Sequence, residues 1–295
     1  MGIIYNNALV LMKAKQNGTT FDKVLTIGRQ NLFIKPIKIK QLAKKFSIDI
    51  TNFKYDHGDY SEEFIKLFLG AKIVDSLDFN DYENANIIHD LNFAIPKEYH
   101  QNYDVVIDGG TLEHIFNFPA AVANCMNFVK QDGSLFIFNM ANNHMGHGFY
   151  QFSPELFFRI FDSNGFIPKD VILDIHKYPG AELGSSGKCY TVNDPKKVGG
   201  RVSLVTKKPV MIMVHGIREK VVDIMSSYPI QSDYQVGSGS TYLAVKGGGY
   251  KRSFIKEVAK KMVDMFPNTI KDNLYGLYQL RNSKISNSSF YSKWK

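Results

Sequence analysis

Side chains suited to proton transfer and ligand binding gather in two short segments of the sequence. The first, residues 108–114, combines an aspartate, a glycine pair and a histidine. The second, residues 142–148, holds His144 and His147 among glycines and asparagines. Because the unperturbed pKa of histidine is about 6.5, an imidazole can accept a proton from a substrate near neutral pH. These segments are therefore the first places in which to look for catalysis.

The first segment belongs to a strand–helix–strand unit. Residues 103–107 (YDVVI) predict a buried strand, and residues 135–138 (LFIF) predict the next one. Between them, apolar residues recur at helical spacing, namely Phe118, Val122, Cys125, Met126 and Val129. Ligands of open α/β sheets bind at the carboxyl ends of the strands. The loop that contains Asp108, Gly109 and Gly110 is therefore expected to border a binding site.

The rest of the first two hundred residues also alternates between strand and helix patterns. Strands are expected at residues 23–28, 72–79, 85–89, 171–175 and 202–206, and helices at residues 3–17, 37–46, 61–69 and 154–164. Such alternation predicts a parallel sheet with helices on both faces. No helix separates the last two strands, so we expect the final strand to run antiparallel. The 25 residues between them, 176–200, are expected to form a long loop over a substrate pocket.

The last third of the chain differs in charge and in pattern. Residues 1–200 hold 20 Lys/Arg and 22 Asp/Glu, whereas residues 201–295 hold 16 and 6, which together give the net charge of +8. Helices are expected at residues 217–225, 253–265 and 269–280, with a glycine-rich connector at residues 236–250. We therefore expect an α/β domain over residues 1–209 and a basic helical appendage over residues 210–295, which could meet a phosphorylated ligand.

Composition excludes several other classes of protein. Two cysteines, Cys125 and Cys189, argue against a disulfide framework and favour a reducing compartment such as the cytoplasm. The amino-terminal residues do not follow the pattern of a signal peptide, and no apolar run is long enough for a transmembrane segment. A dehydrogenase would need a G-x-G-x-x-G fingerprint and a typical hydrolase a G-x-S-x-G elbow, and neither is present.

The chain resembles the class I S-adenosylmethionine-dependent methyltransferases over roughly residues 20–207. The string YDVVIDGGTLEHIFN, with QDGSLFIFN after the helix, is similar to the family's fourth strand, its Leu-Glu-His turn and the turn before its fifth strand. GHGFYQFSPELFFRIFDSNGF resembles the segment that follows. The resemblance implies a doubly wound, Rossmann-like sheet of seven mostly parallel strands with an antiparallel last strand. It favours O-methylation in a surface-glycan, polysaccharide or small-molecule pathway.

The resemblance also implies a binding site for S-adenosylmethionine. Gly28, Arg29 and Gln30 would meet the methionine part of the cofactor, although this loop has one glycine where the family usually has two or three. Asp78, with Asp75 as the alternative, would accept hydrogen bonds from the ribose hydroxyls. The adenine would lie beside Asp90 and Leu91, and the methyl-sulfonium beside Asp108, Gly109 and Gly110.

Methyl transfer to a hydroxyl needs a group that manages one proton. His147 is the expected general base and His114 the second candidate, while Asn143, Tyr150 and Gln151 are expected to line the acceptor pocket. We expect no metal, because ligand spacings diagnostic of a metal are absent. The acceptor would be a small molecule, a sugar or a nucleotide-linked compound.

Two other functions remain open. A non-catalytic binding or assembly protein that had lost the cofactor would explain the single-glycine loop. A nucleic-acid methyltransferase would explain the basic last third, although no tetrapeptide typical of amino-methylating enzymes is present.

Overall fold

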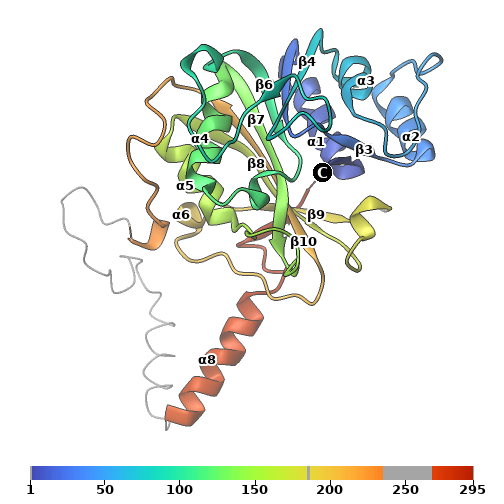
Figure 1. The fold of residues 1–295 in the computed structure, drawn as a ribbon. Coiled ribbons are helices and arrows are strands. Elements are labelled where there is room, and N and C mark those ends of the chain that lie inside the picture. The colour runs from blue at the N-terminus through green and yellow to red at the C-terminus, as the bar shows by residue number, and fades with distance from the viewer. Residues whose placement is uncertain (1, 185–186, 235–267, 295) are drawn as a thin grey trace.

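The computed structural model describes residues 2–184, 187–234 and 268–294. Its centre is a sheet of nine strands in the order β11-β9-β8-β10-β7-β6-β2-β4-β5 (Figure 1). The strands are β2 (Lys23–Ile27), β4 (Ile73–Asp78), β5 (Ile87–Ile88), β6 (Tyr103–Asp108), β7 (Val129–Asn142), β8 (Phe166–Ile175), β9 (Lys188–Val192), β10 (Val210–Arg218) and β11 (Tyr291–Lys293). Two short strands, β1 (Gly2–Ile4) and β3 (Asn31–Phe33), pair in parallel as a separate sheet.

The sheet confirms the predicted α/β class. Strands β5, β4, β2, β6 and β7 are parallel, and β10 pairs antiparallel with both β7 and β8. Strand β8 therefore runs in the same direction as β7, and β10 between them runs in the opposite direction. From β2 the chain moves outward to β4 and β5 and then crosses to β6 on the other side of β2. The boundary between β2 and β6 is thus a topological switch point.

Helices cover both faces of this sheet, as predicted (Figure 1). The helices α4 (Phe118–Phe128) and α5 (Pro154–Ser163) pack on one face in a core with Leu25 and Val106. The opposite face is covered by α1 (Tyr5–Gln16), α2 (Pro36–Phe46), α3 (Glu62–Phe64) and a π-helical turn η1 (Ile65–Leu69), which share a core with Val105 and Ile107. Successive residues of β6 thus point to opposite faces, as the period of a strand requires.

The antiparallel strand is not where the sequence predicted it. Residues 202–206 form no strand, and β10 occupies Val210–Arg218, where a domain boundary and a helix had been expected. Val202 and Leu204 alternate with polar residues because they pack against the core from its surface, which imitates a strand pattern. Strand β10 is buried on both faces, so its run VMIMVHGIR shows no alternation. The α/β sheet therefore continues to Arg218, past the boundary expected at residue 209.

The expected loop at residues 176–200 also contains regular structure. It includes a 3-10 turn η4 (Ala181–Leu183), strand β9 and the short helix α6 (Pro195–Val198). Strand β9 extends the sheet beyond β8, and β11 pairs with β9 from the far end of the chain. The sheet has nine strands instead of seven because β9 and the edge strand β11 are added beyond β8.

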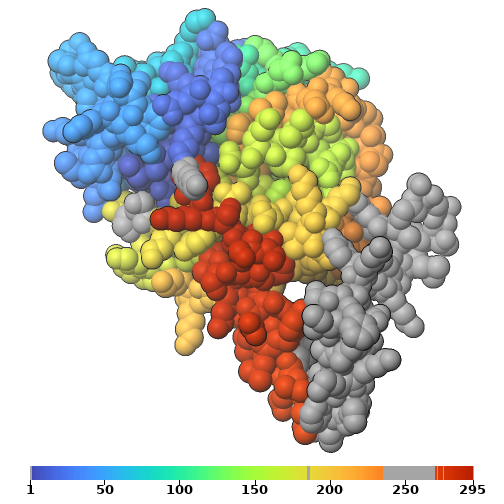
Figure 2. Space-filling view, turned by 180° about the vertical axis from the view of Figure 1, so that it is seen from behind, coloured from blue at the N-terminus to red at the C-terminus, as the bar shows by residue number. Residues whose placement is uncertain are grey.

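The carboxyl-terminal part has one described helix of the three predicted. Helix α8 (Asn268–Asn282) confirms the helix expected at residues 269–280 and projects away from the sheet (Figure 1 and Figure 2). The helix expected at residues 217–225 is absent: the strand ends at Arg218, and irregular chain follows. The predicted connector at residues 236–250 and helix at residues 253–265 lie outside the described residues. No described helix is long and apolar enough to cross a membrane.

Smaller elements complete the fold. The 3-10 turns η2 (Lys97–Tyr99), η3 (Leu112–His114) and η5 (Ser232–Tyr234) connect larger elements. The amino-terminal strand β1 was expected to be part of the first helix. It instead pairs with β3, and the amide of Gly2 donates a hydrogen bond to the carbonyl of Gly109 at 3.1 Å. The amino terminus is thus fastened beside the loop that follows β6.

The contact between α5 and β10 can be tested at Gly216. A Cβ atom at this position would lie 2.6 Å from the ring of Phe161, so Gly216→Ala must displace a buried aromatic side chain. We expect the free energy of unfolding, measured in urea, to fall by about 1 to 3 kcal/mol. Gly276→Ala is the matched control, because Gly276 in α8 has open space around it. It should leave stability unchanged or raise it by up to about 1 kcal/mol; equal effects of the two substitutions would contradict this packing.

Candidate functional site

A pocket of about 220 Å³ lies at the switch point, where the carboxyl ends of four parallel strands meet. Its lining comes from the ends of β2, β4, β5 and β6: Gly28, Leu77, Asp78, Phe79, His89, Asp90, Leu91, Asn92, Thr111, His114 and Ile115. Five of these residues, Gly28, Asp78, Asp90, Leu91 and His114, were predicted site residues. These five residues come from four separate segments of the sequence and meet at this one pocket.

Gly28 and Asp78 line the pocket at the ends of β2 and β4. Gly28 has a φ of 72°, a left-handed conformation that glycine adopts without strain, and its amide donates to the carbonyl of Leu77 at 2.6 Å. This bond joins the loop after β2 to the end of β4. Asp78 follows directly, and its Oδ1 accepts a hydrogen bond from the amide of Phe79 at 2.6 Å. The carboxylate of Asp78 therefore sits at the strand end beside the glycine.

The other predicted carboxylate of the pocket forms a local turn. Oδ1 of Asp90 accepts hydrogen bonds from the backbone amide and the side-chain amide of Asn92, at 2.9 and 2.7 Å. Asn92 in turn holds Asn117 through two further bonds at 2.9 Å. Leu91 between them is buried. An apolar side chain and a hydrogen-bonded turn thus form the wall of the pocket at β5.

Arg29 and Gln30 do not line this pocket. The guanidinium of Arg29 contacts Glu62 at 2.6 Å, donates to the carbonyl of Glu83 at 2.8 Å and stacks on the ring of Tyr60. Gln30 is buried, and its side-chain amide donates to the carbonyls of Ile27 and Gly28. Both side chains stabilise the loop after β2, which differs from the expected role as direct contacts of the methionine carboxylate.

Asp108 is a buried structural carboxylate, not a pocket residue. Its oxygens accept hydrogen bonds from the amides of Thr111, at 2.8 Å, and Leu112, at 3.3 Å, and from the side chain of Asn139. Burial, and secondly the charge of Glu113, raise the pKa of the Asp108 carboxyl well above its usual range. The bonds to Thr111 and Leu112 fold the chain into η3. Asp108 thus positions the residues that follow it.

The glycine pair after Asp108 serves close packing. A Cβ atom on Gly109 would lie 2.2 Å from Oε1 of Gln30, so only glycine fits against this buried amide. Gly110 has a φ of 97°, a left-handed backbone conformation that glycine adopts without strain and other residues adopt only at a cost. Neither residue lines the pocket.

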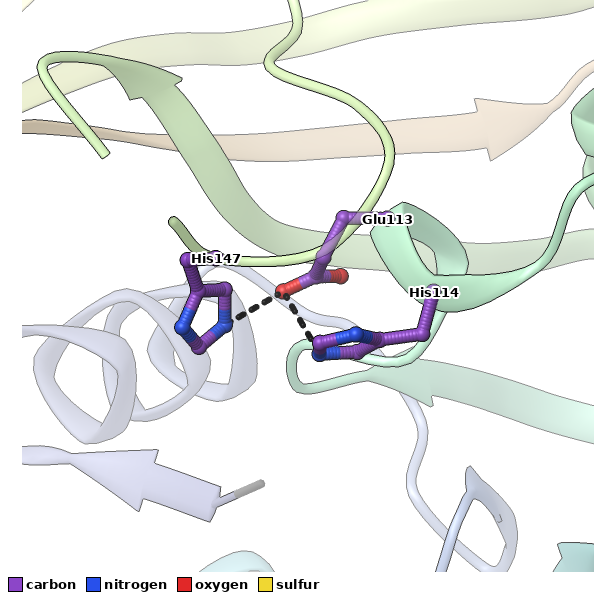
Figure 3. A group of neighbouring side chains, drawn as sticks. All are labelled: Glu113, His114 and His147. Carbon is purple, nitrogen blue, oxygen red and sulfur yellow. Dashed lines mark ion pairs between the residues drawn. The ribbon is translucent and has the colours of Figure 1, made fainter. Parts of the chain in front are cut away.

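Glu113, His114 and His147 form a cluster at the edge of the pocket (Figure 3). Oε1 of Glu113 lies 3.4 Å from Nε2 of His147 and 4.0 Å from Nε2 of His114. The two imidazole rings have centroids 5.0 Å apart. Glu113 is fully buried, whereas the histidine side chains are 43% and 44% exposed. The interaction with Glu113 raises the pKa of His147, although partial burial opposes it.

The loop after β7 is held in place by the residues that were expected to bind the acceptor. Asn143 donates two hydrogen bonds, at 2.9 and 2.7 Å, to the carbonyls of Thr206 and Lys208. Gln151 accepts from the amide of His144 at 2.9 Å, and the hydroxyl of Tyr150 donates to the carbonyl of Phe116 at 2.6 Å. These side chains fasten the loop that presents His147.

Glu113 is the site residue that the sequence analysis missed. It lies between two predicted elements in the Leu-Glu-His turn and was treated as part of that turn only. Its signal in the sequence is an acidic residue directly before a candidate histidine. This signal is weak, because neighbouring side chains on a turn usually diverge, and only the return of the loop with His147 completes the cluster.

Comparison with known proteins gives structural neighbours alone. No protein-family model and no curated protein matches the sequence. Among solved structures, the YcgJ protein of Bacillus subtilis is 12% identical and superposes with a TM-score of 0.43, over 73% of this chain and 99% of that one. A Thermotoga maritima protein described as a SAM-dependent methyltransferase and possible histamine N-methyltransferase is 10% identical, with a TM-score of 0.38 and coverage of 72% and 89%. A Burkholderia thailandensis 1,6-didemethyltoxoflavin-N1-methyltransferase, crystallised with S-adenosylhomocysteine, is 10% identical and has a TM-score of 0.39. The match covers 73% of this chain and 78% of that one. At these TM-scores the likeness decides nothing about chemistry.

The glycines of the His147 loop offer a test of how the cluster is held. Gly148 has a φ of 70°, and a Cβ atom there would lie 2.7 Å from the carbonyl oxygen of Glu113, which accepts from the amide of Phe149 at 2.8 Å. Gly148→Ala should therefore lower the free energy of unfolding by about 1 to 3 kcal/mol and shift the NMR signals of His147. Gly146→Ala, in the same loop but in open space, should change neither. A Gly148→Ala protein with wild-type stability and spectrum would show that the loop is not packed on Glu113.

Proposed function

We propose that this protein is an S-adenosylmethionine-dependent methyltransferase that acts on a hydroxyl of a small-molecule, sugar or nucleotide-linked acceptor. The observation that carries the proposal is the pocket at the switch point. Its lining includes Asp78, Asp90 and Leu91, which the resemblance in sequence assigns to the cofactor's ribose and adenine, together with Gly28, which it assigns to the methionine part. Ligands of open α/β sheets bind at such a switch point.

The pocket has the chemistry that an adenosine group requires. The carboxylate of Asp78 can accept hydrogen bonds from both ribose hydroxyls, as a strand-end acid does in other nucleoside sites of this sheet type. Leu91 offers an apolar surface to the adenine, and the turn of Asp90 and Asn92 offers polar groups to its edge. The direction of β10 also agrees with the proposal. This strand runs antiparallel to its neighbours β7 and β8, and the resemblance implies an antiparallel strand in the sheet.

The acceptor would bind where the pocket meets the histidine cluster. His114 lines the pocket and also faces His147, so it joins the two parts of the site. Methyl transfer is an in-line displacement, and the protein's main task is to align the acceptor oxygen with the methyl group and to handle its proton. We propose His147, and secondly His114, as the groups that handle the proton of that hydroxyl.

A non-catalytic binding protein is the second candidate. It is favoured by the loop after β2, where Arg29 is bound to Glu62 and Gln30 is buried, so neither side chain is left for a cofactor carboxylate. Backbone amides around Gly28 would have to bind that group instead. Direct measurement of cofactor binding separates the two candidates.

Cofactor binding should depend on Asp78. Asp78→Ala removes the proposed partner of the ribose hydroxyls, and loss of hydrogen bonds to a charged group costs about 1.5 to 3 kcal/mol, so affinity for S-adenosylmethionine should fall about 10- to 100-fold. Isothermal titration calorimetry with S-adenosylmethionine and S-adenosylhomocysteine measures this. Asp81→Ala, an exposed aspartate three residues further on that does not line the pocket, is the control and should bind as wild type. If folded wild-type protein binds neither compound, the enzyme proposal fails.

Turnover should depend on His147 while cofactor affinity does not. His147→Ala removes a group at the acceptor side, so we expect turnover to fall by about 10² to 10⁴ with S-adenosylmethionine affinity unchanged. Release of S-adenosylhomocysteine, measured with a panel of sugars, nucleotide sugars and catechols as acceptors, gives the rate. The control is His57→Ala, an exposed histidine that belongs to neither the pocket nor the cluster. Wild-type turnover in His147→Ala would remove His147 from this role.

A further inference from the structure

The cluster beside the pocket contains an unsatisfied buried carboxylate. Neither oxygen of Glu113 has a hydrogen-bond donor among the described residues, and the residue has no solvent exposure. An ionised carboxylate in such surroundings is costly unless a charge or donors compensate it. The two imidazoles, at 3.4 and 4.0 Å from the same oxygen, are the groups that approach it (Figure 3).

The two imidazoles alone compensate this group incompletely. Both approach the same oxygen, Oε1, and no donor among the described residues reaches Oε2. A divalent cation would instead use both imidazoles in their neutral form together with the carboxylate. Three donor atoms of this kind lie within 4.8 Å of one another in the cluster.

The distances are close to those of a metal site. Donor atoms bound at about 2.1 Å to one ion lie roughly 3 to 3.5 Å apart in tetrahedral or octahedral geometry. The contact of Glu113 with His147 at 3.4 Å already has this length, and that with His114 at 4.0 Å needs to shorten by about half an ångström. Both histidine side chains are partly exposed and can turn toward the carboxylate.

The backbone around the cluster is fixed in advance. The carbonyl of Glu113 accepts hydrogen bonds from the amides of Phe149 and Tyr150, at 2.8 and 3.3 Å. These bonds tie η3 to the loop that carries His147, so the three side chains are brought together without a ligand. A site whose donors are already positioned loses less entropy when an ion binds.

We propose that Glu113, His114 and His147 form a binding site for a divalent first-row transition-metal ion. Two histidines and one carboxylate on one side of an ion leave its other positions open for water or substrate. Imidazole ligands favour Co²⁺, Ni²⁺ or Zn²⁺ over Mg²⁺ and Ca²⁺, which prefer oxygen ligands. This metal site departs from the expectation of no metal that the sequence spacing gave.

The catalytic consequence rests on the proposed function. A hydroxyl bound at an open position of the ion would have a lowered pKa and would release its proton to solvent water. The resulting alkoxide oxygen would form a bond to the methyl carbon while the carbon–sulfur bond of the sulfonium breaks. The products would be a methyl ether and S-adenosylhomocysteine. His147 and His114 would then act on the acceptor as ligands of the ion.

Metal titration of the full chain tests the site without any substrate. Protein freed of metal by a chelator should bind one equivalent of Co²⁺, seen in its visible absorption bands, and one of Zn²⁺ by calorimetry, with much weaker binding of Mg²⁺. Glu113→Gln and His147→Gln should each lower the affinity about 10²-fold or more, and His57→Gln should leave it unchanged. Bound ion should also raise the thermal midpoint of wild type and not that of Glu113→Gln.

The outcomes separate this inference from the function. A folded wild-type protein that binds no transition metal, or binding that survives both Glu113→Gln and His147→Gln, would overturn the metal site. Glu113→Gln removes a buried charge and should fold at least as well as wild type, which thermal unfolding of the metal-free proteins checks. Metal binding without binding of S-adenosylmethionine would support the site and contradict the methyltransferase. Binding of S-adenosylmethionine without metal binding would support the methyltransferase and contradict the metal site.

Discussion

Buried carboxylates at the carboxyl end of β6 are the constraint on which the site depends. Asp108 is fully buried and is tolerated there because the amide of Thr111 and the side chain of Asn139 donate hydrogen bonds to it. Satisfying this carboxylate bends the chain into η3. The bend then sends Glu113 into the interior and His114 to the pocket. One satisfied buried acid thus determines where the unsatisfied one lies.

Polar side chains divide into two groups around this centre. Amide and hydroxyl groups fasten the loops: Gln30 holds the loop after β2, Asn143 ties the loop after β7 to the segment before β10, and Tyr150 binds the backbone at residue 116. An amide carries donors and an acceptor and can therefore satisfy backbone groups in both directions. Among the described residues, the side chains of the cluster histidines, His114 and His147, have no such bond to a loop backbone, which leaves them available to a ligand.

How much of the fold and of the candidate site the sequence predicts depends on how far apart the contacting residues lie along the chain. Strands β2, β4, β5, β6, β7 and β8 have apolar runs and turn residues that can be recognised in the sequence. Asp78 is the last residue of β4 and Asp90 lies two residues after β5, so their place at one edge of the sheet follows from those strands. Strand β10 could not be predicted, because a strand buried on both faces lacks the alternation of apolar and polar residues. Residues 202–206 show that alternation without forming a strand. The cluster of Glu113 with His147 joins residues 34 positions apart through a loop whose path local patterns do not specify. Asn143 and Gln30 were recognised as polar residues near the site, but their bonding partners were not.

The position of β10 also affects the order in which the fold can be completed. This strand lies between β7 and β8, yet it follows both of them in the chain. During synthesis on the ribosome, β7 and β8 emerge with facing edges that have unpaired amides and carbonyls and that are not yet joined. Their partner arrives last and must insert between them, pairing at once on both sides. The cooperative step of folding is therefore delayed until residues 210–218 have left the ribosome, and before it the exposed edges are open to intermolecular pairing.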